Sequence, residues 1–203
     1  MPPKIAFVFV NSQNTDMERW YRALPREAFE NLLNPPPTLR HAELKVYVAS
    51  GHHLTELQSP GSDSDAFQNV SGTRDEFTAK ALPKLTHQYE SFRFTRVVFV
   101  AAPSTTITSD FADWAGASQK NIQVDAILID TDHHRYGQHD ISRWSRFVGQ
   151  HKGTMCIVSD VSPAGPAPKT PTKEDQQALA QRLRHAAERV IGWPWYALSG
   201  DHP

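Results

Sequence analysis

Five short apolar runs limit what this chain can fold into more than any other feature of its sequence. Each run is rich in Val, Ile or Phe and is bounded by polar or turn-forming residues. The runs are IAFVFV (5–10), ELKVYVA (43–49), RVVFVAA (96–102), DAILID (125–130) and TMCIVS (154–159). Continuous apolar runs of this length are typical of strands that are covered on both faces, as in a parallel sheet.

Helix signals fill the segments between these runs. TDME (15–18) fits a capping box, Asp140 precedes the helical stretch ISRWSRFV, and TKED (172–175) opens an amphipathic segment. Strands that alternate with helices predict an α/β fold. We therefore expect a single Rossmann-like, three-layer domain over residues 1–203, with a mostly parallel sheet of about five strands.

Two segments interrupt the alternation of strands and helices. Residues 51–75 are rich in Gly, Ser and Asp and predict a long polar loop, while residues 162–172 form a Pro-rich, extended connector. Neither is expected to be a domain boundary, because too little chain follows residue 172 to fold alone.

Charge and cysteine content bound the partners and the compartment. With 21 basic and 22 acidic side chains the formal net charge is −1, so no basic excess indicates nucleic acid as the partner. The first apolar run is too short for a signal sequence or a membrane span. A single cysteine, Cys156, cannot form an intrachain disulfide. We expect a cytoplasmic protein with no membrane partner.

Acidic and imidazole side chains are densest after the fourth run, in AILIDTDHHRYGQHD (126–140). Because ligands bind outside the carboxyl ends of parallel strands, this density predicts a site for Mn²⁺, Mg²⁺ or Zn²⁺. The expected metal ligands are Asp130, Asp132, His133 and Asp16. The expected catalytic residues are His133, His134 and Asp160, with the imidazoles as ligands or as general acid and base. The alternative is an Asx-rich turn with solvated histidines.

Two family resemblances agree with this metal site. ILIDTDHHRYG resembles the signature of the DHH phosphoesterases through Asp132, His133 and His134, and this implies a Mn²⁺-dependent hydrolase of phosphodiesters or pyrophosphate. FVNSQNT (9–15) is similar to the opening strand of NYN/PIN-like nucleases, which carries an Asp and an Asn, and IVSDVS (157–162) is similar to a later acidic strand end of that family. The first of these segments departs from that pattern, since Asn11 stands where the nucleases place a metal-binding carboxylate.

The leading hypothesis is therefore a metal-dependent hydrolase of a phosphoester, acting on a small phosphorylated substrate or on nucleic acid. One alternative is a nucleotide-sugar glycosyltransferase, in which the D-x-D of IDTD holds Mn²⁺ against a diphosphate. The other is a degenerate, TIR-like interaction module, because FVFVNSQNTDMERWYRAL and VVFVAAPSTTITSDFADW resemble the layout of TIR-type domains.

Overall fold

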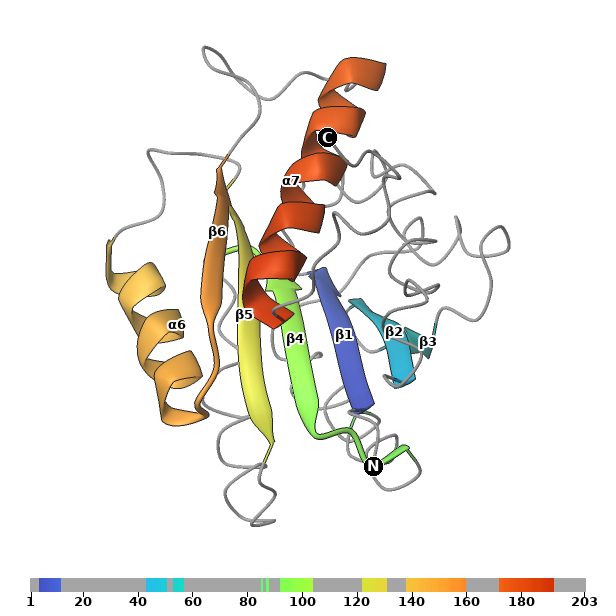
Figure 1. Ribbon diagram of the computed structural model, residues 1–203, viewed down its shortest axis with the longest axis vertical. Coiled ribbons are helices and arrows are strands. Elements are labelled where there is room, and N and C mark those ends of the chain that lie inside the picture. Colours follow the sequence, from blue (N-terminus) through green and yellow to red (C-terminus); the bar gives the residue numbers. More distant parts are fainter. Residues whose placement is uncertain are drawn as a thin grey trace, which may run out of the picture.

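The computed structural model describes the parts of the chain that form the central sheet and two of the helices around it (Figure 1). The described residues are 4–11, 43–50, 53–56, 85, 87, 92–103, 122–130, 138–159 and 172–191.

A six-stranded sheet in the order β3-β2-β1-β4-β5-β6 forms the centre of the fold. Its strands are β1 (Lys4–Asn11), β2 (Glu43–Ser50), β3 (His53–Glu56), β4 (Arg96–Ala101), β5 (Gln123–Asp130) and β6 (Met155–Ser159). The strands β2, β1, β4, β5 and β6 all run parallel to one another, and β3 pairs antiparallel with β2. The parallel strands therefore end at one common edge, the carboxyl edge of the sheet.

Helices cover both faces of the sheet. Trp144, Phe147 and Val148 of α6 (Gln138–Gln150) belong to one core cluster with alternate residues of the strands, such as Val8 and Phe99. The intervening strand residues point to the opposite face. α7 (Lys173–Ile191) lies on that face, in front of β4 and β5 in Figure 1.

Apart from Asp125, the buried residues of the sheet are hydrophobic, which explains why the strands read as continuous runs. Phe7, Phe9 and Phe99 are 0% exposed, and so are Val8 and Val98. Burying one such side chain contributes about 1.5–3 kcal/mol. Both faces of these strands gain from burial, which favours the three-layer arrangement over a sheet with one wet face.

The turn after α6 sets the position of β6. The amide of Gly153 donates to the carbonyl of Val148 at 3.0 Å, and that of Lys152 donates to Gly149 at 3.2 Å. Lys152, two residues after the end of α6, has a positive φ of 58° and is the left-handed residue of this turn. A Cβ on Gly153 would lie 1.6 Å from the carbonyl oxygen of Val124, and this close approach requires glycine.

The predicted α/β class and mostly parallel sheet are confirmed, and each of the five apolar runs is a strand. The predicted loop at 51–75 is wrong at His53–Glu56, which form β3. Leu54 packs against the core while Thr55 is exposed, so the strand does alternate, but over too few residues to stand out in the sequence. α6 begins at Gln138, two residues before the expected cap Asp140.

Neither helix in the described part of the chain combines the length and the apolar character needed to cross a bilayer.

Candidate functional site

The strand order fixes where a ligand is expected to bind. Numbered among the parallel strands alone, the order is 2-1-3-4-5, with β4 as the third. The chain moves outward from β1 to β2 and then returns to the other side of β1 to form β4. β1 and β4 are thus the neighbours between which the direction of winding reverses, and doubly wound sheets bind ligands outside the carboxyl ends at this switch point.

We call the carboxyl ends of these two strands the switch-point edge, and define it by Val10 and Asn11 of β1 and by Ala101, Ala102 and Pro103 at the end of β4. Val10 is 1% exposed, and both alanines are 0% exposed. These five residues include no carboxylate, imidazole or ammonium group. The side chains of the switch-point edge are therefore small and uncharged, unlike those of the acidic site that the sequence predicted.

A side chain from α6 holds the β4 side of this edge. The indole Nε1–H of Trp144 donates to the carbonyl oxygen of Pro103 over 3.2 Å in a fully buried hydrogen bond. The Trp144 ring also packs against Phe99 and Phe147, with centroid separations of 6.2 and 6.1 Å. The sequence did not predict this contact, because it placed Trp144 only within the helical stretch ISRWSRFV.

Of the expected metal-site residues, the structure places only Asp130, as the last residue of β5 in register with Ser159 of β6. The other expected site residues lie outside the described part of the chain; they are Asp16, Asp132, His133, His134 and Asp160. Their assigned roles, and the resemblance of the DHH triplet to a family signature, stay predictions.

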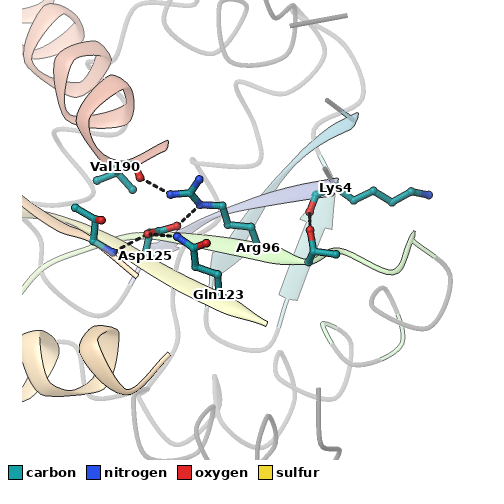
Figure 2. A network of polar contacts seen from close by, with 7 residues as sticks. Lys4, Arg96, Gln123, Asp125 and Val190 are labelled. Atoms are coloured by element: carbon teal, nitrogen blue, oxygen red, sulfur yellow. Dashed lines mark hydrogen bonds and ion pairs between the residues drawn. The ribbon is translucent and has the colours of Figure 1, made fainter. Parts of the chain in front are cut away.

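A buried acid does occur in β5, but at the opposite end of the strand. Asp125 is 0% exposed and accepts from the amide of Thr154 at 2.7 Å and from Nε2 of Gln123 at 3.3 Å. The guanidinium of Arg96 donates through Nε to the same carboxylate and through another nitrogen to the carbonyl of Val190 near the end of α7. Figure 2 shows this network, which ties β4, β5 and α7 together.

This network does not belong to the ligand site. Asp125 precedes the end of β5 by five residues, roughly 16 Å of strand. Its oxygens are occupied by three protein donors, and its charge is matched by Arg96. The sequence analysis included Asp125 in the apolar run DAILID. The one sign of a structural role was an acidic residue at the start of that run, which is the third residue of β5.

Two titratable groups with shifted pKa values also lie away from the switch-point edge. Burial raises the pKa of Tyr47 above its ordinary value, and the Glu56 carboxylate, its register partner on β3, raises it further. Burial lowers the pKa of His151, whose ring contacts Phe147 at a centroid separation of 5.0 Å. Tyr47 is in the core of β2 and His151 is in the turn before β6, and burial in the protein is the main cause of both pKa shifts.

Comparison with solved structures finds proteins of similar arrangement at very low sequence identity. A conserved hypothetical protein, BatB from Bacteroides thetaiotaomicron, is 12% identical, with a TM-score of 0.43 over 92% of this chain and 99% of its own. An FMN-dependent NADH-azoreductase from Bacillus anthracis, in complex with FMN, is 10% identical, with a TM-score of 0.42 over 92% of this chain and 98% of its own.

A flavoprotein from Lactobacillus acidophilus in complex with FMN is 9% identical, with a TM-score of 0.31 over 77% of this chain and 91% of its own. No family model and no curated protein matches the sequence. The strand order by itself is that of a flavodoxin-like sheet.

The prediction of a metal-dependent phosphoesterase or nuclease, with Mn²⁺, Mg²⁺ or Zn²⁺ as its cofactor, is wrong. The described residues contain no group of three His, Cys, Asp or Glu side chains that could hold a metal ion. The physical reason is positional: DTDHH begins at the last residue of β5, whereas the switch point lies between β1 and β4. Neither the glycosyltransferase nor the TIR-like alternative is supported.

Proposed function

We propose that this protein binds flavin mononucleotide at the switch-point edge. The observation that carries the proposal is the strand order, which makes β1 and β4 the central neighbours of a 2-1-3-4-5 parallel sheet. In flavodoxin, a sheet of the same order, FMN binds at this switch point. FMN supplies electron-transfer or hydride-transfer chemistry when it is bound.

The chemistry of the residues at this edge fits a phosphorylated ligand. No acidic side chain lies among its five described residues, so no charge there repels a phosphate dianion. The sequence that continues directly from Asn11 is SQNT, and the sequence that continues from Pro103 is STT. Hydroxyl and amide groups of these types donate hydrogen bonds to phosphate and to the hydroxyls of a sugar chain.

The same uncharged composition argues against phosphoryl transfer at this edge. A site that accepts or activates a phosphoryl group needs a carboxylate, an imidazole or a metal close to the reacting atoms. β1 ends in Val10 and Asn11, and β4 ends in Ala101 followed by Ala102 and Pro103. Of these residues only Asn11 has a side-chain amide, a group that forms hydrogen bonds but is neither a general acid nor a general base. We place the protein in the cytoplasm, where the free thiol of Cys156 stays reduced.

The test is a calorimetric titration of FMN into the purified chain, with riboflavin as the ligand that lacks the phosphate. We expect saturable binding of FMN with one site per chain, and binding of riboflavin that is at least about tenfold weaker because the phosphate contacts are lost. Absence of saturable FMN binding would refute the proposal.

A matched pair of charge substitutions locates the site. Asn11→Asp places a carboxylate at the switch-point edge, and we expect it to weaken FMN binding about tenfold or more through repulsion of the phosphate. Ser159→Asp places the same charge at the end of β6, three strands from β1 and therefore about 14 Å away. At ordinary salt this control is screened and is expected to change Kd less than about twofold. Equal effects of the two substitutions would place the ligand elsewhere.

A further inference from the structure

We propose that Trp144 is a positioning residue for the switch-point edge, and that its indole N–H holds the end of β4 in the conformation that binds the ligand. This inference rests on the proposed function, and it assigns the β4 wall of that site to a side chain from α6. The observation behind it is the buried hydrogen bond of 3.2 Å from Nε1 of Trp144 to the carbonyl oxygen of Pro103.

The geometry gives this bond a role beyond packing. Pro103 follows the last residue of β4 by two positions and lies in a turn, where its carbonyl is no longer part of a strand ladder. Pro103 is itself buried, so water does not readily take the place of the indole donor. Loss of the donor would leave a buried carbonyl without this partner and would release Pro103, the last described residue after β4, from its contact with α6.

The indole is fixed independently of the ligand. Trp144 is 0% exposed and is packed against Phe99 of β4 and Phe147 of α6. Phe99 precedes Pro103 by four residues, so the ring contacts the strand and its nitrogen contacts the turn that follows. α6 therefore supports the site in the way that a preorganised shell supports a binding group, by locking a rotamer before the ligand arrives.

Two substitutions on α6 separate positioning from packing. Trp144→Phe keeps an aromatic ring in the core but removes the N–H donor, whereas Phe147→Leu disturbs the neighbouring ring contact and leaves the donor in place. We expect both variants to have a lower melting temperature. Trp144→Phe is expected to raise the Kd for FMN about 2- to 10-fold, the range that one net hydrogen bond spans. Phe147→Leu is expected to leave Kd within about twofold.

Nuclear magnetic resonance of the wild-type chain gives a second measurement that does not depend on whether a variant folds. The Trp144 indole N–H is expected to exchange slowly with solvent, and its signal and that of the Pro103 carbonyl carbon are expected to shift when FMN is added. FMN binding that is equal in Trp144→Phe and wild type, or that leaves both signals unmoved, overturns the inference and leaves the proposed function standing. Failure of the wild type to bind FMN overturns the proposed function and this inference together.

Discussion

Replacement of Asp125 by Ala is predicted to cost far more stability than loss of an ordinary ion pair. The substitution removes the acceptor of the Thr154 amide, a hydrogen bond of 2.7 Å to a charged group, worth about 1.5–3 kcal/mol. It also leaves the guanidinium of Arg96 without its carboxylate, and breaking a buried pair in this way costs about 3–5 kcal/mol in total. Because the Arg96 side chain retains 18% of its exposure, water offsets part of this loss.

We therefore expect the free energy of unfolding to fall by about 3–4 kcal/mol, the lower half of that range. At about 2–4 °C per kcal/mol for a chain of this size, the melting temperature falls by about 6–16 °C. The free energy is measured by urea denaturation, with the slope against urea checked for constancy so that a change in midpoint reports stability alone.

The matched control is Asp140→Ala on α6. Asp140 accepts from Arg143 at 2.6 Å, but the two side chains retain 28% and 32% of their exposure. Surface pairs of this kind contribute about 0–1 kcal/mol, so this variant is expected to lose no more than about 1 kcal/mol.

A double-mutant cycle of Asp125→Ala with Arg96→Ala should give a coupling energy above about 1.5 kcal/mol. Equal losses for Asp125→Ala and Asp140→Ala would show that the network does not stabilise the fold as argued.

Three further predictions concern the turn after α6 and the two shifted groups. Gly153→Ala should lower the free energy of unfolding by about 3 kcal/mol or more, because its Cβ would lie 1.6 Å from a backbone oxygen. Lys152→Gly relieves a φ of 58° and should raise the free energy of unfolding by about 0.5–1 kcal/mol. Urea denaturation of both variants checks the two signs. The pKa of His151 is lowered from 6.5, so below that pH the unfolded chain binds more protons than the folded chain. Stability should therefore decline as the pH falls below about 6.5 and level off below the folded-state pKa. A histidine titration by nuclear magnetic resonance measures that pKa, and a denaturation series that shows no decline would contradict the prediction. The pKa of Tyr47 is raised from 10.0, so the stability linked to its neutral phenol is present below pH 10.0 and is lost as the pH rises above it. In an absorbance titration, one of the five tyrosines should ionise only as the chain unfolds.

The strands were predictable because burial on both faces leaves a simple pattern. Runs such as IAFVFV cannot stay in water at low cost, and a parallel sheet is the arrangement that covers both of their faces. The four residues of β3 were not predictable, since His53–Glu56 carry a strand pattern too short to separate from a polar loop. The strand order was not predictable either, because nothing in the runs states which strands are neighbours.

The strand order also decides which strand ends lie at the expected ligand site. DTDHH stood out by its chemistry, but whether a strand end faces the ligand depends on the strand order, and β5 lies outside the β1–β4 pair. Trp144 and Asp125 were missed for a related reason. A tryptophan in a helix and an acid in a strand have no visible function until the carbonyl or the guanidinium that each contacts is known.

The position of the Arg96–Asp125 network also bears on how sequences of this kind can diverge. The side chains that join β4, β5 and α7 lie near the amino ends of the strands, whereas the switch-point edge lies at the carboxyl ends. Substitutions at the carboxyl ends of β1 and β4 therefore change no residue of this network. Selection can thus alter that edge of the sheet without first rebuilding the contacts that stabilise the opposite edge.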